Sequence, residues 1–315
     1  MGPGRHSWGG SNTASTSLSA TGVTPGGEEG RFEMRCCVAA AMSILVSGSC
    51  CAAGSCQNEI VPAMTYPSSA GAVAPWTTLY GKSGAGYNSP LTSGLDRYII
   101  MSPPYAPGAT QDGNWVAVID HAHDTNYSPA GTKAIVYVDL NFGANSEATV
   151  EAAIDSLVAN YLGSQDAKLY FDGIFFDRVP GDSGHLVYVT DILNYASSSS
   201  RFGRGDFWMN FGFWPIEPYM NLLPGAFTGA VIENTYAGWS AVDVPNVPGW
   251  VAKYQPFRFA SIVHDVLSSD MVTGTSTANR INIGTVFFTD GTGVNPYANL
   301  PSYWSFELTQ VNGNC

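Results

Sequence analysis

Short apolar, β-branched runs that end in a polar side chain recur along most of the chain. Such runs are typical of strands buried on both faces, as in an all-parallel sheet. Turn residues close several of them, as Val179-Pro180-Gly181 closes YFDGIFFDR. The pattern predicts eight strands, at Ile60–Tyr66, Arg97–Met101, Lys133–Asp139, Phe171–Asp177, Asp206–Phe211, Thr228–Glu233, Arg258–His264 and Ile283–Asp290.

Helical periodicity lies between several of these strands. It is clearest over Ser146–Leu162, where apolar residues recur every three or four positions after a Ser-Glu start suited to a helix cap. Further helices are predicted over Trp115–Asp124 and Ser183–Ala196. The alternation predicts an α/β fold, a (β/α)8 TIM-type barrel. A doubly wound open sheet is the alternative, but no glycine-rich phosphate loop follows the first strand, where Tyr66-Pro67-Ser68 stands instead.

The first 55 residues differ in composition from the rest. Residues 1–33 are rich in Gly, Ser and Thr, and we expect them to be disordered or absent from the mature protein. Residues 34–55 read as a signal peptide, while a short anchor that attaches the N-terminus to a membrane or wall is the alternative. Residues 56–315 suit one barrel domain. We therefore expect a secreted or cell-surface protein.

The net charge of the chain narrows the class of partner that it can bind. The chain has 13 Lys and Arg against 25 Asp and Glu, a formal net charge of −12, and no basic run offsets it. This balance opposes binding to nucleic acid and permits a neutral or cationic ligand such as a polysaccharide. Because charged residues make up 12% of the chain, its surface must consist largely of neutral polar side chains.

Cysteine and histidine spacing leaves two questions open. Cys56 and Cys315 flank the predicted barrel, whose first and last strands would be neighbours. They either form a disulfide, or Cys56 is lost with the leader and Cys315 is free. His121 and His123 are two positions apart and would point to different faces of a helix. We expect no metal site, and no motif predicts a cofactor.

The polar residues that end six predicted strands form the candidate site. In a (β/α)8 barrel the active site lies at the carboxyl ends of the strands, where side chains converge on one pocket. Each residue alone has an alternative role in capping a helix or closing a turn, which is favoured for the Asp before Gly291-Thr292-Gly293. The six are Asp139, Asp177, Asn210, Glu233, His264 and Asp290.

Aromatic residues in or beside the predicted loops favour a sugar ligand, because exposed rings stack on the apolar faces of pyranoses. Some of these rings are expected to pack the loops onto the barrel instead. They are Tyr66, Trp76, Tyr105, Trp214, Tyr236, Trp239, Tyr297, Tyr303 and Trp304. Glycosidic cleavage also needs one protonated and one ionised carboxyl group, and Asp177 and Glu233 are the natural pair. We expect Tyr66, Tyr236, Tyr297 and Trp304 to help bind substrate.

Six motifs in order resemble those of the spherulation-specific family 4 (spherulin-4-like) proteins, over about residues 59–308. They are VPAMTYPS, YFDGIFFDRVP, MNFGFWP, AVIENTYAGW, FASIVHDV and TDGTGVNPYANLPSYW. The resemblance implies a (β/α)8 barrel and, from characterised members, an endo-acting glycoside hydrolase that cuts α-1,4-linked N-acetylgalactosamine polymers of microbial cell walls or biofilms. It places the acidic residues of that activity on Asp177 and Glu233.

The chain departs from the family pattern beside this pair. Members commonly have Asp-Glu where Asp177-Arg178 stands, Asn-Pro-Gly where Asn210-Phe211-Gly212 stands, and an Asn-Pro-rich element in place of Met101–Tyr105. Arg178 either disables hydrolysis or binds substrate at the rim. Two functions remain: a glycoside hydrolase, with Glu233 as acid/base and Asp177 as nucleophile or as the group that orients a substrate acetamide, and a catalytically inactive polysaccharide-binding or cell-wall protein.

Overall fold

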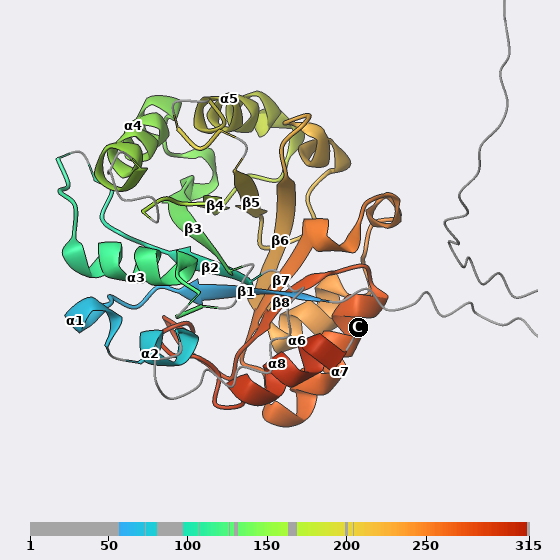
Figure 1. Ribbon diagram of the computed structural model, residues 1–315. Helices are drawn as coiled ribbons and strands as arrows, with labels where there is room; N and C mark the ends of the chain where they lie inside the picture. The colour runs from blue at the N-terminus through green and yellow to red at the C-terminus, as the bar shows by residue number, and fades with distance from the viewer. Residues whose placement is uncertain are drawn as a thin grey trace, which may run out of the picture. The chain divides into compact units, whose positions relative to one another are not determined.

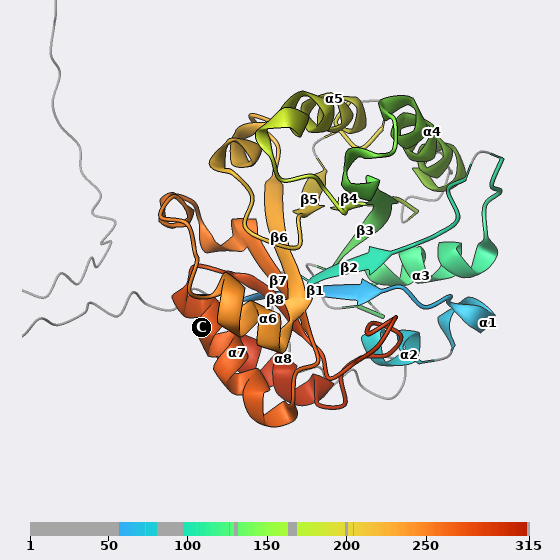
Figure 2. The same cartoon turned by 180° about the vertical axis from the view of Figure 1, so that it is seen from behind.

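The computed structural model describes residues 57–313 apart from 73, 81–96, 107, 126, 129–131, 163–168, 199–200 and 204. Its eight parallel strands follow one another around a closed barrel, with the last strand paired to the first (Figure 1). Helices surround the strands, as the view from behind also shows (Figure 2). The predicted (β/α)8 class is confirmed.

All eight predicted strands are present, and their ends differ from the predicted ones by up to three residues. The last strand is shorter than predicted, the sixth extends two residues beyond Glu233, and the first ends before Met64. The strands are β1 (Asn58–Ala63), β2 (Arg97–Met101), β3 (Thr132–Asp139), β4 (Gly173–Asp177), β5 (Asp206–Asn210), β6 (Thr228–Thr235), β7 (Phe259–His264) and β8 (Thr285–Phe288).

The α-helices are α1 (Ser68–Gly71), α2 (Trp76–Leu79), α3 (Gly113–His123), α4 (Glu147–Leu157), α5 (Leu186–Ala196), α6 (Tyr236–Gly238), α7 (Ser268–Arg280) and α8 (Trp304–Gly313). Short 3₁₀ turns lie at Asn141–Gly143, Ser183–His185, Glu217–Asn221, Val251–Lys253 and Pro256–Arg258, and π turns at Val158–Leu162 and Trp239–Asp243. Ser146 caps α4 as predicted, since its hydroxyl accepts from the Thr149 N–H at 3.3 Å.

Helix α7 was not predicted, because its sequence SSDMVTGTSTANR is rich in residues of weak helix propensity. Its buried residues nevertheless recur at helical spacing: Met271, Gly274, Thr275 and Ala278. The lack of a side chain at Gly274 lets α7 approach β8, since a Cβ there would lie 2.7 Å from the Phe288 ring. Tertiary packing therefore decides this helix rather than local propensity.

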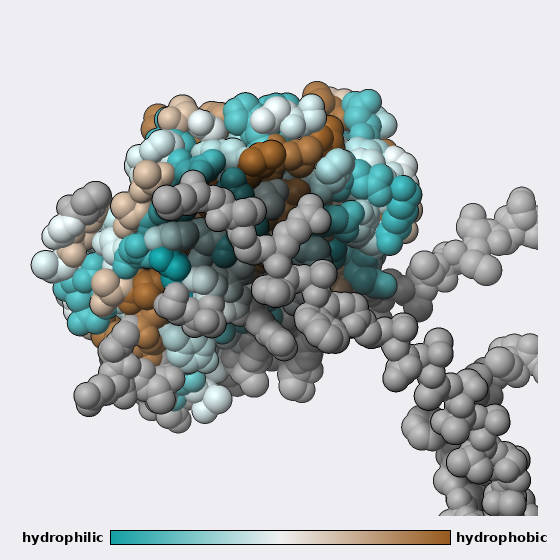
Figure 3. All heavy atoms as spheres, turned by 90° about the horizontal axis from the view of Figure 1, so that it is seen from above, coloured by the Kyte–Doolittle hydropathy of each residue, from teal (hydrophilic) through white to brown (hydrophobic). Residues whose placement is uncertain are grey.

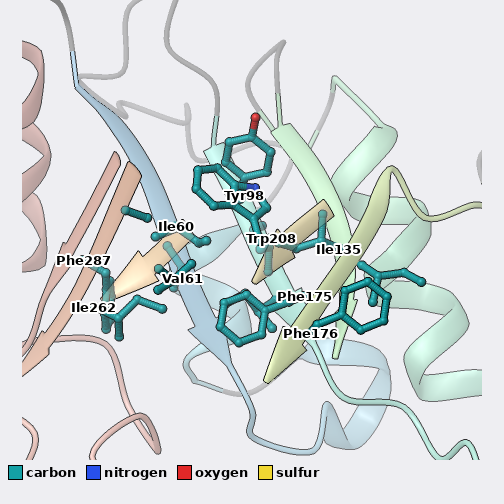
Figure 4. Close-up of a cluster of buried hydrophobic side chains, with 14 of the residues drawn as sticks. Ile60, Val61, Tyr98, Ile135, Phe175, Phe176, Trp208, Ile262 and Phe287 are labelled. Atoms are coloured by element: carbon teal, nitrogen blue, oxygen red, sulfur yellow. The ribbon is translucent and has the colours of Figure 1, made fainter. Parts of the chain in front are cut away.

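Alternate side chains of each strand fill the barrel interior, as the two-residue period of a strand requires. Figure 4 shows Tyr98 and Trp208 together in this interior, and their rings meet edge to face at 5.1 Å. Gly229 of β6 makes room for Trp208, because a Cβ there would lie 2.4 Å from the indole. At the amino-terminal ends of the strands, Lys133 bonds Asp206 at 2.7 Å. Within the described part of the chain, the barrel interior is thus filled toward the amino-terminal ends of the strands.

The surface seen from above in Figure 3 mixes polar and apolar residues, in keeping with the low charged content. The predicted extension (1–33), the signal peptide (34–55), Cys56 and Cys315 lie outside the described residues, so the disulfide and the leader stay predictions. Within the described part of the chain, no helix combines the length and the apolar character needed to cross a membrane.

Candidate active site

A pocket of about 100 Å³ lies at the carboxyl ends of the strands. It is lined from β1, β2, β3, β4, β6 and β7 and from the segments after β1 and β8. Its lining residues are Pro62, Met64, Ile100, Tyr137, Phe175, Asp177, Glu233, Ile262 and Tyr297. Both members of the predicted catalytic pair, Asp177 and Glu233, therefore face the same space.

Asn210 joins the two carboxylates. Its Nδ2 donates to Asp177 Oδ1 at 2.7 Å and also to Glu233 Oε2. The oxygen of this amide fixes its orientation, because Asn210 Oδ1 accepts a hydrogen bond from the Gly212 N–H at 3.1 Å. Strand β5 lies between β4 and β6, which brings its last residue between their ends. Because both oxygens bond one nitrogen, they lie within about 6 Å of each other.

Two tyrosines bind the remaining carboxylate oxygens. Tyr137 donates to Asp177 Oδ2 at 2.8 Å, and Tyr297 donates to Glu233 Oε1 at 2.5 Å. Tyr297 was predicted from its loop position, whereas Tyr137 was missed. A signal for Tyr137 exists, since it stands two positions before Asp139 in β3 and so shares its face of the strand. All four oxygens of the pair thus accept hydrogen bonds from neutral donors.

Burial raises the pKa of Glu233, and the nearby charge of Asp177 raises it further. Hydrogen bonds from Tyr297 and Asn210 act in the opposite direction, as does the charge of His264. Burial, and then the charge of Glu233, raises the pKa of the Tyr297 hydroxyl, which therefore remains a donor. Glu233 is the member of the pair better suited to hold a proton.

The Arg178 side chain pairs with Asp139. Its Nε donates to Asp139 Oδ1 at 2.8 Å, and its Nη2 bonds Asp139 Oδ2. The β3–β4 register places Asp139 beside Asp177, so this ion pair lies on the rim next to the pocket. The backbone of Arg178 has a φ of +51°, a left-handed conformation that costs a non-glycine residue about 1–2 kcal/mol and is found in turns and at functional sites. The guanidinium of Arg178 is thus paired with Asp139, while Asp177 bonds Tyr137 and Asn210.

His264, at the end of β7, lies beside the pair. Its ring meets the Tyr297 ring edge to face at 6.2 Å, and its Nδ1 lies 3.0 Å from Asp265 Oδ2. Tyr66 lines a groove that adjoins the pocket at Met64. The structure therefore gathers Asp139, Arg178 and His264 around the pair, and places Tyr66 next to it.

Three other predicted residues lie outside the pocket. The Asp290 carboxylate accepts from the Ser302 N–H at 3.1 Å and from its hydroxyl, and so fastens the segment before α8. Tyr236 stacks on Trp239 at 6.2 Å, and Trp304 is buried against Phe287. The structure does not bring these three together with Asp177 and Glu233.

A larger hollow of about 540 Å³ lies between the α2 region and the start of α8. No carboxylate, histidine, lysine or arginine is present among the described residues that line it. It therefore offers no acid–base pair. The smaller pocket at the strand ends is lined by two carboxyl groups, those of Asp177 and Glu233.

The described residues include no group of three or more His, Cys, Asp or Glu arranged to hold a metal ion. The two histidines of α3 have other contacts: His121 stacks on Tyr127, and His123 Nε2 lies 3.0 Å from Asp172 Oδ2.

Comparison with curated proteins gives no match. Among solved structures, the crystal structure of Aspergillus clavatus Sph3 in complex with GalNAc matches with a TM-score of 0.64 and 21% identity, over 81% of this chain and 97% of that one. A GH5-4 broad-specificity endoglucanase from Clostridium acetobutylicum matches with a TM-score of 0.43 and 13% identity, over 82% and 94%. The likeness to Sph3 agrees with the barrel fold.

The sequence profile of spherulation-specific family 4 matches residues 59–311. This range spans the barrel almost from end to end and contains the pocket, Asn210 and both carboxylates. The chain belongs to spherulation-specific family 4.

Proposed function

We propose that this protein is a secreted, endo-acting glycoside hydrolase that cleaves an N-acetylgalactosamine-containing polysaccharide of microbial cell walls or biofilms. One observation carries the proposal: Asp177 and Glu233, from separate strands, share the Asn210 amide nitrogen in one pocket. Family membership supports the substrate class, as does the GalNAc bound in the crystal structure of Sph3.

The spacing of the pair favours a retaining mechanism. Retaining glycosidases hold their carboxyl groups about 5–5.5 Å apart and inverting ones about 6.5–9.5 Å, and one shared nitrogen keeps these two oxygens within about 6 Å. Glu233 then protonates the glycosidic oxygen as the C1–O bond breaks, while Asp177 bonds C1. Glu233 next removes a proton from water, which attacks C1 and releases Asp177. If Asp177 instead orients the substrate acetamide, the acetamide oxygen bonds C1 as the glycosidic C1–O bond breaks and Glu233 protonates the leaving oxygen. Water deprotonated by Glu233 then attacks C1 and breaks the bond to the acetamide oxygen.

The lining of the pocket favours an N-acetyl group over a free amine. Ile100, Phe175 and Ile262 form an apolar wall, and both oxygens of Asp177 already accept hydrogen bonds. A volume of about 100 Å³ has room for about three waters, which matches an acetamide better than a whole pyranose. We infer that the acetamide enters the pocket and that the sugar ring lies across its mouth.

The position of Arg178 favours the hydrolase over the inactive binding protein. Because the guanidinium pairs with Asp139, Asp177 keeps its access to the pocket. The family resemblance implies an acidic residue at position 178, but both proposed catalytic carboxyl groups, Asp177 and Glu233, line the pocket. The binding protein remains the alternative outcome of the following test.

The test is incubation of the protein with polymers of α-1,4-linked N-acetylgalactosamine, galactosamine and glucosamine and with α- and β-glucans, followed by measurement of new reducing ends. We expect cleavage of the N-acetylated galactosamine polymer. Asp177→Asn should lower turnover by at least about 10²-fold while binding persists. Asp191→Asn, on the exposed side of α5, is the matched control and should cleave normally.

Binding without cleavage by the wild-type protein would establish the binding protein instead, and absence of both would exclude this substrate class. Secretion is tested separately by N-terminal sequencing of the protein from culture medium. A start within or after residues 34–55 is expected, and retention of the whole protein inside cells would contradict secretion.

A further inference from the structure

A groove of about 410 Å³ continues the pocket across the ends of β1 and β2. Met64 lines both spaces, so the groove adjoins the pocket at this residue. In Figure 2 the arrowheads of β1 and β2 point toward the side on which α1 and α3 lie. The residues that line the groove are Met64, Tyr66, Ser102, Pro103, Pro104, Tyr105, Ala106 and Trp115.

Tyr66 gives the groove a fixed aromatic platform. Tyr66 is 48% exposed, although its hydroxyl both donates and accepts a hydrogen bond. The hydroxyl donates to Asp112 Oδ2 at 2.9 Å and accepts from Asn114 Nδ2 at 2.8 Å. The edge-to-face contact with the buried Trp115, at 6.4 Å, supports the ring from the side. A ring held in this way loses little conformational freedom when a ligand stacks on it.

The lining selects for an uncharged ligand. Of the described residues that face the groove, none carries a formal charge, and Met64, Pro103, Pro104 and Ala106 present apolar surface. A carboxylate group would lose hydration there without gaining a counter-charge from the lining. The apolar face of a neutral pyranose can stack on Tyr66. The volume also falls within the range of about 300–1,000 Å³ typical of ligand sites.

The groove is built partly from the segment that follows β2. Ser102, Pro103, Pro104 and Tyr105 of this segment line it. Tyr105 lies close to Asp139, whose charge, after burial, raises the pKa of the phenol. The segment thus extends from the groove toward the rim of the catalytic pocket.

We propose that this groove is a subsite that binds an uncharged pyranose unit of the polysaccharide, stacked on Tyr66, beside the unit that is cleaved. The proposal rests on the function proposed above, and it adds that substrates must extend beyond the reacting unit to be used efficiently. The groove then sets the preference of this protein for chain length.

The test compares kcat/KM over a series of N-acetylgalactosamine oligomers of increasing length, for the wild-type protein and for Tyr66→Ala. We expect the gain in kcat/KM from the shortest to the longest oligomer to fall by about 5- to 30-fold in Tyr66→Ala, the effect of losing one stacked ring. Tyr66→Phe keeps the ring and should keep most of the gain. Phe257→Ala removes a similarly exposed ring, 46% against 48%, before β7 at the opposite end of the barrel, and should leave the gain unchanged.

The subsite is refuted if Tyr66→Ala gains as much from oligomer length as the wild-type protein does, or if Phe257→Ala loses the gain equally. Failure of the proposed function looks different, because no oligomer of any length is then cleaved. In that case titration calorimetry of the same series measures binding. A length-dependent loss of affinity confined to Tyr66→Ala still supports the subsite, and equal affinities for all variants refute it.

Discussion

The barrel holds two pairs of carboxyl groups, a half-buried pair at its mouth and a buried pair behind its wall. Asp177 and Glu233 line the pocket at the strand ends. Glu59 of β1 and Glu307 of α8 are 1% and 0% exposed, on the side of the wall that faces the helices. Burial raises the pKa of Glu233, Glu59 and Glu307 alike. A raised pKa therefore does not by itself identify the active site.

The two pairs differ in the number of their hydrogen-bond donors and in whether a pocket reaches them. Four donor contacts, from Asn210 and two tyrosines, reach the oxygens of the first pair. In the second pair, Glu307 Oε1 accepts the Phe288 N–H at 2.6 Å, and the other three oxygens have no hydrogen-bond donor within the described part of the chain. Arg97 of β2 is the register partner of Glu59, and its positive charge lowers the pKa of Glu59. We interpret the mouth pair as catalytic and the wall pair as structural.

The largest effect on stability should come from the wall pair. Glu307→Ala leaves the buried Phe288 N–H unpaired and opens a cavity, which should lower the free energy of unfolding by about 2–4 kcal/mol. Glu307→Gln keeps an oxygen for this N–H and should lose less. Denaturant unfolding measures both variants, and equal, negligible losses would show that Glu307 does not anchor α8.

Among substitutions that keep both carboxylates of the mouth pair, Asn210→Ala should have the largest effect on turnover. Without the shared donor the two carboxylates repel each other, and turnover should fall roughly 10- to 100-fold. Since the Asn210 hydrogen bond lowers the pKa of Glu233, its loss should move the alkaline limb of the pH–rate profile to higher pH. Asn194→Ala, on the exposed face of α5, is the control. An unshifted limb would contradict the bridging role.

Glu59 should make stability depend on pH. Burial raises its pKa to about 8, against the opposing charge of Arg97, so the folded protein binds a proton that the unfolded chain releases near pH 4.5. The unfolding free energy should therefore fall as pH rises from about 5 to 8, by at most about 1.4 kcal/mol per pH unit. Glu59→Gln should flatten this slope. A slope that is the same in both proteins would assign the effect to other groups.

The smallest effect is expected at the rim. Arg178 is 42% exposed and pairs with Asp139, an arrangement worth about 0–1 kcal/mol. Arg178→Ala should change turnover by less than about fivefold, and Arg178→Glu, which restores the acidic pair of the family, should not raise it. A large gain in hydrolysis by Arg178→Glu would show instead that the guanidinium disables the site.

Much of this arrangement follows from strand patterns. Each of the eight strands is a local apolar run, and polar residues at or near the ends of β3 to β7 mark the barrel mouth, so Asp177, Asn210 and Glu233 were predictable together. The loop after β8 shows where such reasoning stops. Tyr297 reaches Glu233, Asp290 holds Ser302, and Trp304 is buried, although all three follow the same strand. The contacts of these three side chains depend on non-local packing, which local periodicity does not encode.

The most direct test of the central claim compares Glu233→Gln with Glu307→Gln, the same chemical change in the two pairs. Turnover of the N-acetylated polymer and thermal unfolding are measured for both. We predict that Glu233→Gln loses about 10²–10⁴-fold in turnover and unfolds like the wild-type protein, because it removes a proton donor and no packing. Glu307→Gln should keep its turnover and lose stability. Wild-type turnover in Glu233→Gln, or an equal loss in Glu307→Gln, would contradict the division of the two pairs into catalytic and structural.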